Sequence, residues 1–161
     1  REGVRWAVRT PPTGGDPLAL ENFRNIEVPQ AFDRVWVAAD NAGLQRDDLS
    51  IILTHIYLVD SDSSPGYDES AVETHTSPGF DAGNSQLDVT ALADENFQKH
   101  TQISALRGDN YEQLDNELVV VEVFYRHETI WGIDIIGPFG ADWTMYAQSS
   151  MRMIGTGRSG D

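Results

Sequence analysis

The segment 117–127, Glu-Leu-Val-Val-Val-Glu-Val-Phe-Tyr-Arg-His, constrains the fold more than any other part of the chain. It is rich in β-branched and aromatic residues and has no Gly or Pro, so it predicts a strand rather than a helix. One face is apolar along its length and carries Val119, Val121, Val123 and Tyr125. The other face is apolar at one end and polar at the other. We therefore expect an interior strand whose first face is fully covered and whose second face is covered in part.

Three other segments have periodicities that fit around this strand. Residues 50–59 are largely apolar on both faces and predict a strand beside it. Residues 142–154 alternate between two faces and predict a final strand. Residues 29–44 predict a helix that ends near Gly43, because apolar residues recur at i, i+3, i+4 and i+7 spacing. That apolar stripe consists of Phe32, Val35, Trp36, Ala39 and Ala42.

The remaining segments have weaker patterns. Residues 17–28 predict an irregular stretch with a helical turn, and residues 90–106 predict a short helix. Residues 60–89 are dense in Asp, Ser, Gly and Pro, which predicts a long acidic loop or insertion without regular structure. Residues 1–10 are interpreted as the end of a truncated N-terminal helix, and residues 155–161 as a flexible tail.

The length and the order of these elements predict a single domain over 1–161. A chain of 161 residues is long enough for one core and too short for two comfortable domains. Helices that lead into a small antiparallel sheet and pack on it define an α+β fold. The expected core residues are Phe32, Trp36, Ile52, Leu53, Val121, Val123 and Phe124.

The composition excludes several classes of function. The formal net charge is −15, and only 11 Lys and Arg are spread over the whole chain. A face that binds nucleic acid needs clustered basic residues, so we expect no nucleic-acid partner, and anionic membrane surfaces are disfavoured for the same reason. No run of 18 apolar residues occurs, and the absence of cysteine excludes disulfides and thiolate chemistry.

Four histidines, His55, His75, His100 and His127, are candidates for chemistry. No two of them have the spacing of metal ligands on one strand or one helix. His55 and His127 approach each other if their strands pair in a suitable register, and a hydrolase that uses one of them with a loop Asp is one alternative function. A hydrogen-bonded structural histidine is the interpretation that we favour. The chain has no Gly-x-Ser-x-Gly elbow and no Gly-rich phosphate-binding loop.

The acidic segment 60–69 offers the hard oxygen ligands that Ca²⁺ prefers. The candidate metal ligands are Asp60, Asp62 and Asp68. The segment is not an EF-hand, because Pro65 replaces the required Gly and Ala71 stands where the bidentate Glu belongs. A Ca²⁺-dependent adhesin or carbohydrate-binding module is a second alternative function, and a solvated loop that holds no cofactor is the plainer interpretation.

Two separated stretches resemble the TadE/TadG-like family of pilus-assembly pseudopilins from tight-adherence systems. The first, Arg-Glu-Gly-Val-Arg-Trp-Ala at 1–7, is similar to the end of that family's N-terminal segment, where an apolar transmembrane helix runs into an Ala-Arg-Glu-Gly-x-Arg type of sequence. The second is the Val-rich segment 119–125, which ends in Tyr125. A Gly-rich loop and a last strand with Tyr146 and Met151-Arg152 follow it, as in the family. Residues 60–89 have no motif that matches the family.

The resemblance implies a pilin-like head domain with a non-enzymatic role in pilus assembly. It implies that the partners are other pilin or pseudopilin subunits, including copies of the chain itself. It also implies a location at the cell envelope or outside the cell. Contact with the membrane is expected only through the family's N-terminal helix, which is absent from this chain, so the head domain itself is expected to be soluble.

Overall fold

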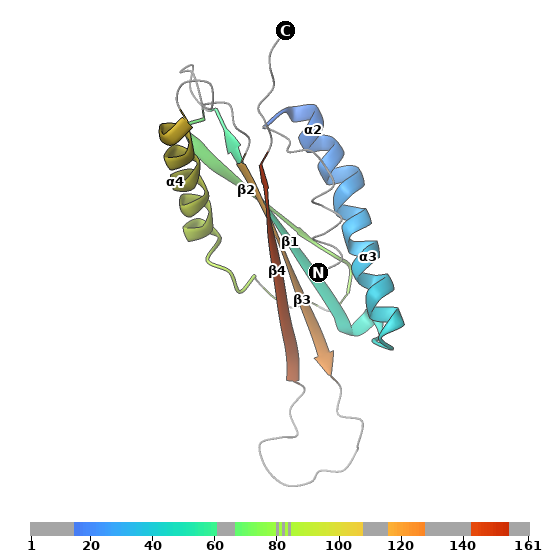
Figure 1. The fold of residues 1–161 in the computed structure, drawn as a ribbon. Coiled ribbons are helices and arrows are strands. Elements are labelled where there is room, and N and C mark those ends of the chain that lie inside the picture. The colour runs from blue at the N-terminus through green and yellow to red at the C-terminus, as the bar shows by residue number, and fades with distance from the viewer. Residues whose placement is uncertain are drawn as a thin grey trace.

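The computed structural model describes residues 15–60, 67–79, 81, 83, 85–107, 116–127 and 143–154. In chain order its elements are α2 (Pro17–Asn22), the π-helical η1 (Phe23–Glu27), α3 (Val28–Asn41), the 3-10 turn η2 (Arg46–Asp48), β1 (Leu49–Val59), β2 (Glu69–Thr76), α4 (Val89–Arg107), β3 (Asn116–His127) and β4 (Trp143–Ile154). The four strands form one antiparallel sheet in the order β2-β1-β3-β4 (Figure 1). The predicted α+β fold is confirmed. A helix of 25 residues precedes the four strands, and α4 lies between β2 and β3 in the chain.

Strand β3 lies inside the sheet, as its sequence predicted. It pairs with β1 on one side and with β4 on the other. Val119 and Val121 are buried on one face, and Leu118 and Val120 on the opposite face. The expectation that this second face becomes polar and wet is wrong at Glu122, which is fully buried. Its carboxylate stays in the interior because it receives several hydrogen bonds, described below.

Strand β2 corrects the prediction that residues 60–89 have no regular structure. It pairs with β1 so that Glu69 lies opposite Val59 and Thr76 lies opposite Ile52. Because β1 is buried along almost its whole length, its backbone needs a hydrogen-bonding partner on both sides. β2 supplies the second partner as an edge strand, where none of its residues is fully buried and a polar sequence is tolerated.

The first helix begins earlier than predicted, because residues 17–28 are helical rather than irregular. Asp16 caps the helix by accepting hydrogen bonds of 2.9 Å from the backbone N–H groups of Leu18 and Ala19. Pro17 lies in the first turn, where its missing N–H leaves no intrahelical bond unmade. The helix ends at Asn41, close to the prediction, and Gly43 follows its C-cap with a φ of 75°, the left-handed conformation typical of a helix C-terminus.

The π-helical turn η1 explains why the regular spacing of apolar residues did not reveal the N-terminal part of this helix. In an uninterrupted α-helix Phe23 would lie about 140° from Val28 around the helix axis, because each residue turns by about 100°. The π turn takes up about one extra residue and brings Phe23 to about 40° from Val28. Both residues are therefore buried in the same core against the sheet.

The helices cover opposite faces of the sheet (Figure 1). The α2–α3 helix covers the larger apolar cluster, which contains Phe23, Val28, Ala31, Phe32, Ala39, Leu49, Ile51, Leu53, Val119 and Val121. Helix α4 covers a smaller cluster of Ile56, Ala93, Leu118 and Val120. Trp36 and Val123, both expected in the core, are only half-buried at the border of the larger cluster, whereas the other five expected core residues are buried.

Helix α4 and strand β4 lie where segments 90–106 and 142–154 predicted a helix and a strand. Three other predicted features fall outside the described residues. These are the helical end at 1–10, the tail at 155–161 and the candidate ligand Asp62.

Candidate functional site

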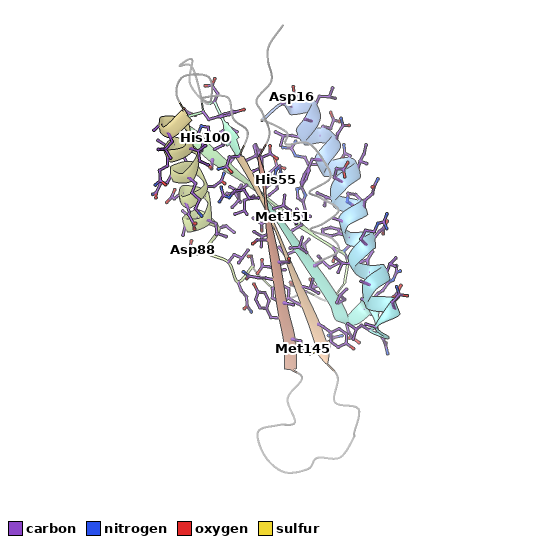
Figure 2. The ribbon with its side chains drawn as sticks, viewed as in Figure 1. Asp16, His55, Asp88, His100, Met145 and Met151 are labelled. Atoms are coloured by element: carbon purple, nitrogen blue, oxygen red, sulfur yellow. The ribbon has the colours of Figure 1, made fainter. Side chains whose placement is uncertain are left out.

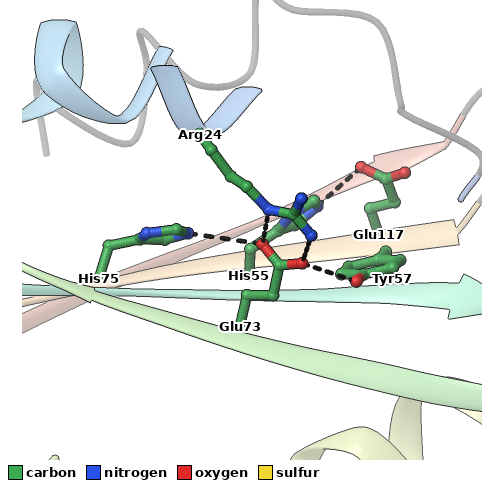
Figure 3. Close-up of polar contacts among 6 residues, drawn as sticks. All are labelled: Arg24, His55, Tyr57, Glu73, His75 and Glu117. Carbon is green, nitrogen blue, oxygen red and sulfur yellow. Dashed lines mark hydrogen bonds and ion pairs between the residues drawn. The ribbon is translucent and has the colours of Figure 1, made fainter. Parts of the chain in front are cut away.

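Charged and aromatic side chains gather beneath the π-helical turn, on the sheet face that the α2–α3 helix covers (Figure 3). Residues paired across antiparallel strands point to the same face, and the register places Glu73 of β2 opposite His55 of β1. One helix and three strands therefore contribute to the cluster. Its members are Arg24, His55, Tyr57, Glu73, His75 and Glu117.

Glu73 is the centre of the more exposed half of this cluster. Arg24 donates to both of its carboxylate oxygens, through Nε to Oε2 at 2.8 Å and through Nη2 to Oε1. The hydroxyl of Tyr57 donates to Oε1 at 2.8 Å. The hydrogen bond from Arg24 lowers the pKa of Glu73 to about 2, and burial together with the bond to Glu73 raises the pKa of Tyr57 to about 12. At neutral pH Glu73 is therefore ionised and Tyr57 is protonated.

His55 and Glu117 form the enclosed half of the cluster. His55 Nε2 lies 2.9 Å from Glu117 Oε2, and the two side chains are 0% and 1% exposed. The ring of Phe23 covers the imidazole, with ring centroids 4.2 Å apart. His55 Nδ1 has no hydrogen-bond partner among the described residues. Because the imidazole is sealed from solvent, it offers no surface to a substrate, and the geometry gives the hydrolase alternative no support from His55.

The register of the strands does not bring His55 and His127 together, although the sequence left that arrangement open. In the register of β1 with β3, His55 lies opposite Val119, and His127 follows Val119 by eight residues (127 − 119). At about 3.3 Å per residue this separates the two positions by roughly 26 Å along the strand. The sequence could not reveal this distance, because both strands are apolar on two faces and accept several registers.

The two remaining histidines have separate surroundings. His75 Nε2 lies 3.6 Å from Glu73 Oε2, and burial lowers the pKa of His75 below its ordinary value. His100 is buried on α4, with the ring of Tyr67 edge-on to it at 5.6 Å between centroids. His55 and His75 therefore belong to one cluster, whereas His100 lies apart from them on α4 (Figure 2).

Two of the candidate Ca²⁺ ligands, Asp60 and Asp68, lie directly after β1 and directly before β2. Asp60 is exposed directly after β1, and Asp68 is half-buried just before β2, with its N–H donating to the carbonyl of Val59 at 3.1 Å. Asp62 lies outside the described residues. Over residues 15–60, 67–79, 81, 83, 85–107, 116–127 and 143–154, no three His, Asp or Glu side chains are placed to hold a metal ion.

A second polar network surrounds Glu122 on the opposite face of the sheet. The hydroxyl of Ser85 donates to its Oε2, and the backbone N–H of Gln86 donates to its Oε1 at 2.9 Å. The hydroxyl of Tyr146 on β4 also donates to Oε1, at 3.1 Å. These bonds fasten the segment before α4 to the centre of the sheet. Burial and the bond to Glu122 raise the pKa of Tyr146 to about 12.

A third network joins α4 to the two strands at its side of the sheet. Asn96 and Asn116 donate through their side-chain amides to each other's backbone carbonyl, at 3.0 and 3.1 Å. Arg152 of β4 donates through Nη1 to Oδ1 of both residues, at 2.8 Å each. Both Asn side chains are buried, so these three residues form a fixed polar frame rather than a surface contact.

Sequence reasoning missed most members of these networks, because their partners lie far apart in the chain. Arg24 and Glu73 are 49 residues apart, and Asn96 and Arg152 are 56 apart. One signal was available in the sequence: Glu117 precedes, and Glu122 interrupts, the apolar run of residues 118–125. A carboxylate in an interior strand is expected to have buried partners.

Neither a protein-family model nor a curated protein sequence matches this chain. The helices of the described residues lack the length and apolar character that crossing a bilayer requires.

Proposed function

We propose that this chain is a non-enzymatic subunit of the TadE/TadG-like pseudopilin type. It acts in pilus assembly by packing against other pilin or pseudopilin subunits, including copies of itself, at the cell envelope or outside the cell. The support comes from the motifs at 1–7 and 119–125 and from an α+β fold in which a long helix precedes and covers an antiparallel sheet.

The observation that carries this proposal is the two-sided character of the α2–α3 helix. Its inner face is buried in the larger apolar cluster. On its outer side Leu18, Ile26 and Val37 remain 67%, 47% and 52% exposed. Val37 follows the buried Val28 by nine residues, which places it about 180° away around the helix. Apolar side chains on the outer face of a helix are available to pack against a neighbouring subunit.

Site-directed cross-linking in the native host tests this surface. The chain has no cysteine, so a single introduced thiol reports on one position. Leu18→Cys, Ile26→Cys and Val37→Cys place that thiol on the outer helix face, and Asp94→Cys places it on an exposed position of α4 as the control. With a short maleimide–diazirine reagent, which attaches to the introduced thiol and inserts into a neighbouring residue on irradiation, we expect the helix variants to form adducts whose second component has a pilin-like sequence or is another copy of the chain. The control is expected to form none.

Complementation of a gene deletion supplies the functional measurement. Ile26→Asp and Val37→Asp place a charge on the outer face without touching the core, and they are expected to lower the number of pili seen by electron microscopy. Asp94→Asn is expected to restore the wild-type number. Normal piliation in the deletion strain itself, or helix adducts formed only with proteins unrelated to pilins, would overturn the proposed function.

A further inference from the structure

A groove opens between helix α4 and strand β4, on the sheet face opposite the charged cluster. Its volume is about 280 Å³, and Leu92, Glu95, Lys99, Leu118, Ser150, Met151 and Arg152 line it. Helix α4 packs on β1, β2 and β3 and leaves the same face of β4 largely uncovered. On β4 this face carries Gln148, Ser150 and Arg152, two residues apart, as the register with β3 shows.

The guanidinium of Arg152 is held at the wall of this groove without an acidic partner. Its two described hydrogen bonds both come from Nη1 and go to neutral amide oxygens of Asn96 and Asn116. The other N–H groups, on Nε and Nη2, have no partner among the described residues. Within the described residues no carboxylate lies within ion-pair distance of Arg152, and Glu95 attracts it only from farther away while accepting a hydrogen bond from Lys99. A partly buried cation that lacks a directly bonded carboxylate gains free energy when one binds it, and a guanidinium binds a carboxylate through two parallel bonds.

The edge of β4 beside this groove is open. β4 is the last strand of the sheet, so no described strand pairs with its outer side. Its twelve residues contain no Pro and a single charge, that of Arg152, and the positions 144–148 are exposed. A long edge strand without Pro, Lys or a bulge readily adds another strand. A strand added there would place alternate side chains beside Gln148, Ser150 and Arg152, under the flank of α4.

We propose that β4 and the groove bind an extended acidic segment of another protein, which adds to the sheet as a fifth strand and places one carboxylate on Arg152. A second copy of the chain paired through its own β4 does not meet this requirement, because β4 contains no Asp or Glu. The occupant therefore has an extended conformation, an acidic side chain opposite Arg152 and an uncharged side chain two residues away, beside Ser150. This inference stands independently of the proposed role in pilus assembly.

Peptide binding tests the carboxylate requirement. The probe is a fluorescein-labelled decapeptide of alternating Thr and Val with one Glu near its centre, and the comparison peptide has Gln in place of that Glu. By fluorescence anisotropy we expect the Glu peptide to bind at least about tenfold more tightly, since a charge-assisted hydrogen bond is worth about 1.5–3 kcal/mol. Equal affinity of the two peptides for the wild-type protein, or no binding of either, would overturn the proposal.

Variants of the protein locate the binding. Arg152→Gln is expected to abolish the difference between the Glu and Gln peptides, and Arg152→Lys to retain part of it, because Lys keeps the charge and loses the paired bonds. Arg34→Gln, on an exposed position of α3, is the matched control and is expected to keep the full difference. Circular dichroism confirms that each variant is folded. A difference that survives in Arg152→Gln would place the site elsewhere.

Backbone methylation of the peptide tests the strand addition without changing the protein. Two versions of the Glu peptide carry N-methyl groups on either the odd or the even residues. A strand that adds to one edge uses only one of these two sets of N–H groups, so one version is expected to lose binding and the other to keep it. Equal retention by both versions would contradict a fifth strand.

Discussion

The two faces of the sheet are covered in different ways. On one face, α3 presents a regular apolar stripe and shares a large cluster with β1 and β3. On the other face, α4 contributes Ala93 and the half-buried Leu92 to a small cluster, and its position depends in addition on the frame of Asn96, Asn116 and Arg152. Apolar packing seals the first face, whereas a few directional hydrogen bonds fix the second helix and leave a groove at its side.

The largest expected effect is a difference in stability between two variants, each with an apolar side chain shortened on one of the two helices. Phe23→Ala removes a ring that is 1% exposed and covers His55, so it is expected to lower the free energy of unfolding by about 3–5 kcal/mol. Leu92→Ala on α4 removes a half-buried side chain, and a loss of about 1 kcal/mol is expected. Urea denaturation of both variants measures the difference. Equal losses would show that the two faces do not differ in how much their apolar cores contribute.

The second effect concerns the buried pair on the sealed face. Glu117→Leu leaves the enclosed imidazole of His55 without its partner and is expected to lower the free energy of unfolding by about 3 kcal/mol. The double variant His55→Phe/Glu117→Leu replaces both groups by apolar ones and is expected to recover most of that loss. If the double variant is as unstable as Glu117→Leu, the two side chains contribute more to stability than the hydrogen bond that each provides to the other. Thermal and urea unfolding of the three proteins supply the comparison.

The third effect is a pH dependence that belongs to the exposed half of the charged cluster. Arg24 holds the pKa of Glu73 at about 2, below its ordinary value of 4.5, so the native state favours the ionised form. The contribution to stability is fully present above about pH 4.5 and is lost as the pH falls toward 2. Its size is about 2 kcal/mol after an allowance for the partly exposed Arg24.

Glu73→Gln is the variant that isolates this contribution. Its stability is expected to fall less steeply than that of the wild type between pH 5 and 2.5, and the two curves are expected to converge at the acid end. Asp33→Asn, on an exposed position of α3, serves as the control. Parallel curves for Glu73→Gln and the wild type would mean that Arg24 and Glu73 do not interact in solution.

The smallest effect tests the frame that fixes α4. Asn96→Ala removes the hydrogen bond to the Asn116 carbonyl and one of the two acceptors of Arg152. We expect the free energy of unfolding to fall by about 1–2 kcal/mol. Amide hydrogen exchange is expected to accelerate in α4 and to stay unchanged in α3. Asn22→Ala, at an exposed position whose side chain makes no capping bond, is the control. Acceleration in both helices would show that the two faces are coupled.

The sequence predicted the helices and strands whose own residues carry a recognisable apolar pattern. β1 and β3 are runs rich in β-branched residues, β4 alternates between two faces, and the stripe from Phe32 to Ala39 has the helical period, so all four elements lie close to the predicted bounds. β2 was missed because an edge strand paired to a buried neighbour needs no apolar face of its own. The start of the first helix was missed because the π turn shifts Phe23 out of the regular period.

The candidate site was less predictable than the fold, because it depends on register and on contacts between distant segments. His55 pairs with Glu117 rather than approaching His127, and only the alignment of β1 with β3 decides between them. Arg24, in the π turn, contacts Glu73 of β2, a segment that the sequence did not predict as a strand. The resemblance to pseudopilins concerns other residues and implied nothing about these contacts.

The open edge of β4 has a consequence for how the protein behaves in concentrated solution. The strand lacks the Lys and Pro residues with which edge strands usually resist uncontrolled association. The formal net charge of −15 provides the resistance at the level of the whole molecule, because like-charged copies repel one another before their edges meet. This repulsion reaches about 10 Å at 0.1 M salt and only about 3 Å at 1 M. We therefore expect low salt to keep the protein dispersed and concentrated salt to favour association between these edges.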